Sequence, residues 1–137
     1  MALTGGGGAP NVTGGGNPAG TGTALNYVLN RVYAYSGGIS TNGNETDLLN
    51  FSTGNEVLHT TVYVSSLTST DDFQFNVYIN GEVSFFAKFM AGANYGMPRN
   101  VEMPMLLPPF SEVRITAQNV TDTTSHDCCA TVTGVIV

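Results

Sequence analysis

The segment from Asp72 to Met90, DFQFNVYINGEVSFFAKFM, constrains the fold of this chain more than any other segment does. Apolar residues alternate with polar ones on both sides of the pair Asn80-Gly81. Alternation with a period of two is typical of a β-strand that buries one face. Asn-Gly between two such runs is a strong hairpin signal, because both residues tolerate a positive φ. The sequence therefore predicts an antiparallel hairpin with strands at Asp72–Ile79 and Val83–Met90.

The register of this hairpin depends on which side chains it buries. A two-residue turn at Asn80-Gly81 would place Ile79 opposite Glu82 and mix an apolar face with a charged one. One added residue instead pairs apolar with apolar: Ile79 with Val83, Val77 with Phe85, Phe75 with Ala87 and Phe73 with Phe89. A slip of one residue moves every side chain to the other face, so burial selects the second register. We therefore expect a three-residue loop or a bulge at Gly81–Glu82.

Six further segments have the composition of strands, and no segment is a convincing helix. They are rich in β-branched and aromatic residues and are bounded by Gly, Pro, Asn or Ser. They are residues 24–35, 45–51, 56–65, 101–107, 112–119 and 128–137. In the first of them the alternation slips at Asn30-Arg31, and helical spacing is a competing interpretation. In 101–107, Pro104 lacks an amide donor, so we expect it at a sheet edge or a bulge.

Eight strands at near-regular spacing predict an all-β domain with its core between two sheets. The number fits a single eight-stranded β-sandwich of the jelly-roll type, over residues 24–137. The hairpin would then lie inside one sheet, and the last strand would pair with the first. Residues 1–23 contain almost no apolar side chains, so they are expected to form a flexible Gly/Pro/Asn-rich arm. Alternatively, the arm becomes ordered along a neighbouring subunit.

The low charge of the chain restricts its partners. Only 10% of the 137 residues are charged, and the net charge is −6. Nucleic-acid binding requires clustered cations, and four scattered Lys and Arg residues do not provide them. The same shortage argues against an anionic membrane surface, and no stretch is long enough to span a bilayer. We expect neither nucleic acid nor membrane as a partner, and no signal peptide is visible.

The residues that could carry chemistry are two histidines and two adjacent cysteines. His126, Asp127, Cys128 and Cys129 are consecutive, so they do not all converge on one metal ion. A Cys–His nucleophile pair would need His59, and no nucleophile elbow accompanies it. Neighbours in a strand face opposite ways, so one thiol should be buried and the other exposed, both reduced. We expect no enzyme activity, no metal and no cofactor.

A Gly-rich arm, the hairpin FQFNVYINGEVSFFAKF and the run MPMLLPPFSEVRITAQN occur together in this chain. The last run predicts a strand, a Pro corner and a second strand. This pattern, over about residues 24–137, resembles the single jelly-roll structural proteins of virus particles, in particular the decoration (cement) proteins on the heads of tailed bacteriophages. The resemblance implies a capsid decoration protein, made in the host cytoplasm and located on the capsid surface of the virion. Its implied partners are the major capsid protein and other copies of itself, as a homotrimer.

Contacts to these partners are expected from the arm and from the loop that follows the hairpin. The candidates are Asn11, Val12 and Pro18 in the arm, and Tyr95, Met97 and Arg99 in the loop. The alternative is a carbohydrate- or receptor-binding β-sandwich of a virion fibre or surface. Exposed tyrosines would then form the site, and the candidates are Tyr33, Tyr35, Tyr63, Tyr78 and Tyr95.

Overall fold

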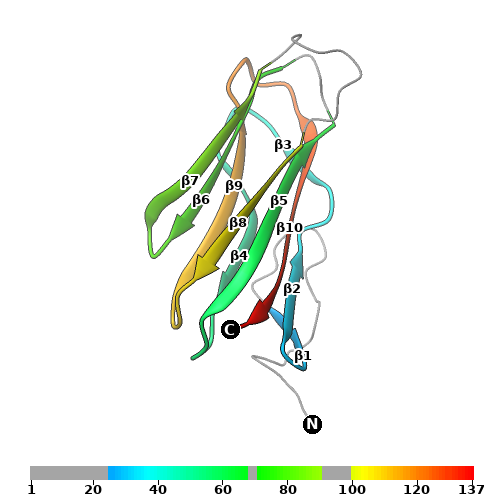
Figure 1. Cartoon of the computed structure of the whole chain (residues 1–137). Helices are drawn as coiled ribbons and strands as arrows, with labels where there is room; N and C mark the ends of the chain where they lie inside the picture. Colours follow the sequence, from blue (N-terminus) through cyan, green and yellow to red (C-terminus); the bar gives the residue numbers. More distant parts are fainter. Residues whose placement is uncertain (1–24, 68–70, 91–99) are drawn as a thin grey trace.

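The computed structural model describes residues 25–67, 71–90 and 100–137, and its regular elements are ten β-strands in two antiparallel sheets (Figure 1). The larger sheet has the order β1-β2-β10-β5-β8, with β3 also paired to β10, and the smaller sheet has the order β4-β9-β6-β7. The bounds are β1 (Asn26–Val28), β2 (Arg31–Tyr35), β3 (Ile39–Thr41), β4 (Thr46–Ser52), β5 (Leu58–Ser66), β6 (Phe73–Ile79), β7 (Glu82–Phe89), β8 (Asn100–Leu107), β9 (Glu112–Asn119) and β10 (His126–Ile136). Within the described ranges, no helix is long and apolar enough to cross a membrane.

Eight of the ten strands have the jelly-roll arrangement that the sequence predicts. Strands β2, β10, β5 and β8 form one layer, and β4, β9, β6 and β7 form the other. The last strand, β10, pairs with β2 along Thr131–Val135, which confirms the expected contact between the two ends of the domain. The short strands β1 and β3 raise the count from eight to ten.

The first predicted strand, residues 24–35, is a hairpin rather than a single strand. Strands β1 and β2 pair with each other, and Val28 lies opposite Arg31 across a two-residue turn. The turn residue Leu29 has a φ of 56° and is 93% exposed. The slip in alternation at Asn30-Arg31 therefore marks a reversal of the chain.

The β6–β7 hairpin has the predicted register over most of its length. Phe73 lies opposite Phe89, Phe75 opposite Ala87 and Val77 opposite Phe85. However, the extra residue is not at Gly81–Glu82, because Ile79 pairs with Glu82 and Tyr78 with Val83. The bulge instead falls at Ser84, the residue of β7 that the register shift skips.

The turn of this hairpin is the two-residue turn Asn80-Gly81, with φ values of 53° and 85°. Two positive φ angles give a turn whose twist matches that of the flanking strands. Asn80 also accepts a hydrogen bond from the backbone N–H of Glu112 through Oδ1 at 2.9 Å. Strand β7 is the outermost strand of its sheet, so the expectation that the hairpin would lie inside a sheet is wrong.

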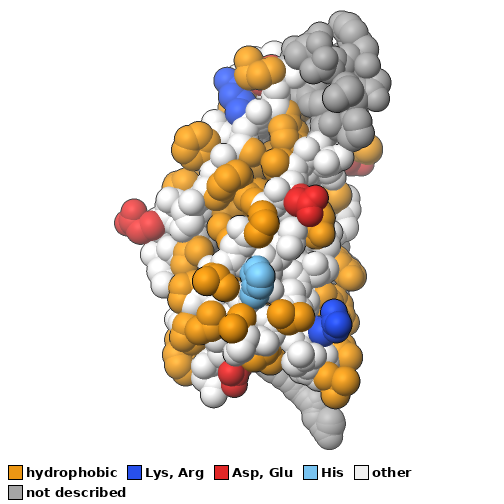
Figure 2. Space-filling view, viewed as in Figure 1, with side chains coloured by type: hydrophobic (Ala, Val, Ile, Leu, Met, Phe, Trp, Pro, Cys, Tyr) orange, Lys and Arg blue, Asp and Glu red, His pale blue; other side chains and the backbone are white. Residues whose placement is uncertain are grey.

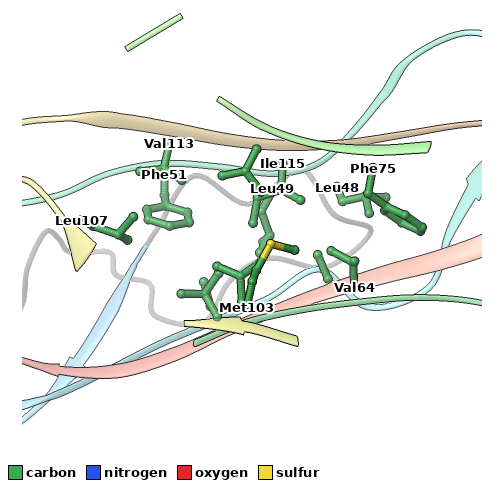
Figure 3. Packing of buried hydrophobic residues seen from close by; sticks show 14 of the residues in the cluster. Leu48, Leu49, Phe51, Val64, Phe75, Met103, Leu107, Val113 and Ile115 are labelled. Atoms are coloured by element: carbon green, nitrogen blue, oxygen red, sulfur yellow. The ribbon is translucent and has the colours of Figure 1, made fainter. Parts of the chain in front are cut away.

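The two sheets bury one apolar core between them (Figure 3). Phe51, Phe75 and Ile115 of the smaller sheet point toward Val64 and Met103 of the larger sheet. Each large side chain removed from water stabilises the fold by about 1.5–3 kcal/mol. The residues predicted to face inward on β8 and β9 all contribute to this core: Val101, Met103, Met105, Val113, Ile115 and Ala117. The core thereby fixes which side chains remain on the two outer faces.

Candidate interaction surface

The six residues predicted to contact partners, Asn11, Val12, Pro18, Tyr95, Met97 and Arg99, lie outside the described residues. The described sandwich offers a partner two outer sheet faces and five strands that have a neighbour on one side only. The two outer faces differ in chemistry: one is rich in tyrosine and threonine, and the other carries a hydrogen-bonded polar cluster.

Six of the side chains that strands β2, β10 and β5 place on the outer face of the larger sheet are tyrosines and threonines. We name them the Tyr–Thr face: Tyr33, Tyr35, Thr61, Tyr63, Thr131 and Thr133. Thr131 lies between Tyr35 on one neighbouring strand and Tyr63 on the other. The rings of Tyr33 and Tyr35 are 5.2 Å apart between centroids. Tyr35 and Tyr63 are 53% and 41% exposed, so both rings are accessible to a partner.

Charged side chains lie at the border of the Tyr–Thr face rather than within it. Arg31 begins β2, Asp127 lies near the start of β10, and Glu102 lies opposite Tyr63 on β8. Figure 2 shows hydrophobic side chains spread over this side of the molecule, with few charged ones among them. Tyrosine combines a large apolar ring with a hydroxyl that can remain hydrated, so such a face suits a protein or a carbohydrate partner.

A hollow of about 360 Å³ adjoins the Tyr–Thr face. Its lining residues are Tyr35, Gly37, Gly38, Ser65, Leu67, Asp127, Cys128, Cys129 and Thr131. Here the Sγ of Cys129 lies 3.0 Å from the Oγ of Ser65. Small-molecule sites in proteins have volumes from about 300 Å³ upward, so the hollow is large enough for a small ligand. It is continuous with the Tyr–Thr face because Tyr35 and Thr131 belong to both.

The two adjacent cysteines face opposite ways, as predicted. Cys128 is 2% exposed, and burial raises the pKa of its thiol, whereas Cys129 is partly exposed. Cys129 lies opposite Ser65 on β5, and His59 lies six residues away along that strand, about 20 Å at 3.3 Å per residue. The Cys–His pair considered from the sequence therefore does not form. In the described residues, no group of three or more His, Cys, Asp or Glu side chains could hold a metal ion.

The outer face of the smaller sheet carries a polar cluster around Glu45. The Oε2 of Glu45 accepts hydrogen bonds from Thr116 Oγ1 at 2.6 Å, Tyr78 OH at 2.5 Å and Asn76 Nδ2 at 3.2 Å. Desolvation raises the pKa of the Glu45 carboxyl, but these hydrogen bonds and the Arg114 charge outweigh it, so the pKa is lowered. The cluster links Glu45, the residue before β4, to β6 and β9. Tyr78 therefore lies on the opposite outer face of the sandwich from Tyr33, Tyr35 and Tyr63.

A second polar cluster lies where β6 begins and β9 ends. Asp71 is 7% exposed, and its Oδ2 accepts a hydrogen bond from Asn119 Nδ2 at 2.8 Å and lies 2.9 Å from His126 Nε2. Asn119 also donates to the carbonyl of Thr124 at 2.9 Å. His126 is the first residue of β10, and its contact with the buried carboxylate of Asp71 holds this end of the strand in place. In the sequence, two adjacent acids before a strand, Asp71 and Asp72, are typical of an exposed turn. The sequence pattern therefore does not indicate that Asp71 is buried in a polar cluster.

Neither a known protein family nor a curated protein matches this sequence. Solved structures with a similar fold include the VP2 subviral particle of infectious bursal disease virus, at 12% identity over 77% of this chain and with a TM-score of 0.48. They also include the endospore appendages of Bacillus, at 12% identity over 84% of this chain and all of that one, with a TM-score of 0.47. A third is a family 35 carbohydrate-binding module from Clostridium thermocellum, at 12% identity over 82% of this chain and 78% of that one, with a TM-score of 0.41. The chain spans only 32% of the VP2 chain, and each likeness concerns the fold alone.

Proposed function

We propose that this chain is a structural protein of a virus particle, which binds the capsid surface as a decoration protein and catalyses no reaction. The observation that carries the proposal is the Tyr–Thr face, a rigid, uncharged surface with charges only at its border. Protein interfaces are enriched in aromatic residues and depleted of charge at their centre. The virus assignment is supported by the resemblance of the sequence pattern to capsid decoration proteins. The net charge of −6 suits a position away from packaged DNA.

Attachment would come from the burial of aromatic and apolar surface, without a covalent bond. The Tyr–Thr face loses little conformational freedom on docking, because threonine is β-branched and tyrosine has only two rotatable side-chain bonds. Because little conformational entropy is lost on binding, more of the contact energy contributes to the binding free energy. The expected partner is the major capsid protein, and trimeric self-association would add multivalent attachment. Residues 1–23 would add backbone hydrogen bonds to the edge of a neighbouring sheet.

The test is whether the chain co-purifies with virus particles on a density gradient. Particles are prepared from a lysate that contains the chain, either as wild type or as the double variant Tyr35→Ser and Tyr63→Ser. The control is Phe110→Ser, which removes an aromatic ring that is 78% exposed and lies outside the Tyr–Thr face. We expect wild type and control in the particle fraction and the double variant in the soluble fraction. A wild-type chain that stays soluble overturns the proposal.

The hollow beside Tyr35 favours a second candidate function, a carbohydrate- or receptor-binding module of a virion fibre or surface. A partly enclosed site next to exposed aromatic rings suits a sugar, because an aromatic ring offers an apolar face to the sugar ring. Two measurements separate the candidates: retention on immobilised glycans, and the mass by light scattering of the full chain and of a chain without residues 1–23. A monomer retained by a glycan supports the binding module. A trimer in both forms, not retained, supports the decoration protein.

A further inference from the structure

The turn between β1 and β2 carries a leucine that makes little contact with the rest of the chain. Leu29 is 93% exposed, and its φ is 56°. A positive φ is unfavourable for a residue with a Cβ, and Gly, Asn and Asp are the residues that adopt it readily. The turn thus combines backbone strain with a large apolar side chain in water. Because strained backbone is concentrated at functional sites in proteins, Leu29 is a candidate contact residue.

Hydrogen bonds hold this turn in place at one end of the larger sheet. Strands β1 and β2 pair up to the turn, where Val28 lies opposite Arg31. The backbone N–H of Ile136, at the end of β10, donates to the carbonyl of Asn30 at 2.8 Å. Leu29 therefore projects from a fixed loop, and its insertion into a pocket costs little conformational entropy.

The hollow beside the Tyr–Thr face lies at the opposite end of the larger sheet (Figure 1). On β10, Val135 lies opposite Arg31 near the turn, and Cys129, which lines the hollow, is six residues away. Six residues of a strand span about 20 Å at 3.3 Å per residue. Leu29 therefore does not reach the hollow of its own chain, whereas the hollow of another copy is open to it.

The hollow is large enough to hold this side chain. Its volume is about 360 Å³. A cavity of about 150 Å³ in a protein already accepts a group of the size of benzene. The hollow therefore accommodates a leucine side chain, and the part left over admits the turn that carries it.

The turn and the hollow are each accompanied by one charged residue, and the two charges are opposite. Arg31 follows the turn, and of the described residues that line the hollow, only Asp127 is charged. Both side chains are exposed, and within the described part of the chain neither takes part in an ion pair. By strand alternation, Arg31 shares the outer face with Tyr33, and Asp127 shares it with Thr131. Two copies placed end to end, with this face on the same side, therefore bring Arg31 of one beside Asp127 of the other.

We propose that copies of this chain associate head to tail: Leu29 of one copy enters the hollow of the next, and Arg31 of the first pairs with Asp127 of the second. Each copy uses two different surfaces, so the contact is heterologous. Such a contact closes into a ring where the rotation between copies permits it, and otherwise grows into an open chain. The inference goes beyond the proposed capsid role and does not depend on it, because the contact requires only the isolated chain.

The first experiment measures mass against concentration by sedimentation. We expect the wild type to reach three copies or more. Arg31→Asp and Asp127→Arg each place like charges across the contact, so each should weaken association at least tenfold, and the double variant should restore it. An effect of net charge alone would act in opposite directions in the two single variants.

The leucine is tested in the same assay. Leu29→Ser should weaken association at least tenfold, because it removes the side chain that fills the hollow. The matched control is Phe110→Ser, since Phe110 is also an exposed apolar residue at positive φ, 78% exposed at 54°. We expect this control to associate as the wild type does.

Mixing two variants shows whether the contact joins different surfaces. Leu29→Ser retains an intact hollow, and Asp127→Arg retains an intact turn. At concentrations where neither variant associates alone, the mixture should form a complex with one copy of each and nothing larger. A contact between identical surfaces would not produce this complex.

The thiol of Cys129 reports whether the hollow is occupied. We expect its labelling by N-ethylmaleimide to slow as the concentration of wild type rises, and to stay constant for Leu29→Ser. The inference is overturned by a wild type that stays monomeric or stops at a dimer, by a double charge variant that does not recover, or by labelling that is independent of concentration. Leu29→Ser leaves the Tyr–Thr face intact, so particle binding by this variant tests the proposed function separately.

Discussion

Gly134→Ala tests how closely β10 packs against β5 within the larger sheet. A Cβ at position 134 would press against the carbonyl oxygen of His59 and lie 2.7 Å from Cγ2 and 2.8 Å from Cα of Thr60. Gly134 lies opposite Thr60 in the β10–β5 pairing. Two of the three contacted atoms belong to the backbone, so a change of side-chain rotamer does not relieve the clash. The substitution must push two hydrogen-bonded strands apart.

The expected loss of stability is at the upper end of the range for overpacking. Inserting a methyl group into a well-packed site typically costs about 1–3 kcal/mol, and more where the backbone must move. We therefore expect Gly134→Ala to lower the free energy of unfolding by about 3 kcal/mol or more. That is a large share of the roughly 5–15 kcal/mol that stabilises a domain. For a chain of this size it corresponds to a fall in Tm of roughly 10 °C.

Urea unfolding followed by circular dichroism measures this loss directly. Gly38→Ala is the control, because a Cβ at that position meets no atom of the described residues within 4 Å. We expect Gly38→Ala to change the free energy of unfolding by no more than about 0.5 kcal/mol, or to raise it slightly by restricting the unfolded chain. A loss below 1 kcal/mol for Gly134→Ala, or equal losses for the two variants, would refute the reasoning.

Three further predictions follow from the core and the polar groups. Glu45→Gln should destabilise the fold by about 1 kcal/mol at pH 7. Folding lowers the pKa of Glu45, so this carboxylate stabilises the fold fully above its pKa in the unfolded chain, about 4.3, and the stabilisation is lost as the pH falls through its pKa in the folded chain. The free energies of unfolding of wild type and variant, measured with urea, should therefore converge in acid. A thiol reagent should label one cysteine per folded chain, Cys129, and a second, Cys128, only in denaturant; two fast-reacting thiols in the folded chain would contradict the burial of Cys128. Phe51→Ala, at a side chain 1% exposed in the core, should cost about 3–5 kcal/mol in the same unfolding assay.

The strands were predictable because burial acts on a local pattern of side chains. Strand β9 occupies the predicted residues 112–119, and the inner register of the β6–β7 hairpin follows from apolar pairing alone. The turn after β1 was not predictable, because a leucine at positive φ is not a turn signal. The bulge lies at Ser84 and not at the predicted Gly81–Glu82. The turn at Asn80-Gly81 is held in its two-residue form by hydrogen bonds of Asn80 with Ser111 and Glu112, which are distant in sequence.

The candidate surface was only partly visible in the sequence. Tyr33, Tyr35 and Tyr63 were individual candidates, but they form one face because β10 lies between β2 and β5. The clusters around Glu45 and Asp71 had no sequence signal, since their partners come from strands far along the chain. Predictions for the arm and for residues 91–99 stay predictions, because these lie outside the described residues.

The central position of β10 in the larger sheet has a consequence for synthesis of the chain. Strand β10 follows every strand that it joins, and Thr131 pairs with Tyr35 on one side and Tyr63 on the other (Figure 1). Until residues 126–136 leave the ribosome, the β1–β2 hairpin and the β5–β8 pair are not joined, and β2 and β5 each have one unpaired edge. Closing so long a loop costs about 4 kcal/mol of entropy and makes folding slow. A chain in which β10 has not yet paired therefore exposes one edge of β2 and one edge of β5 to other chains, and the late pairing of β10 closes both edges in a single step.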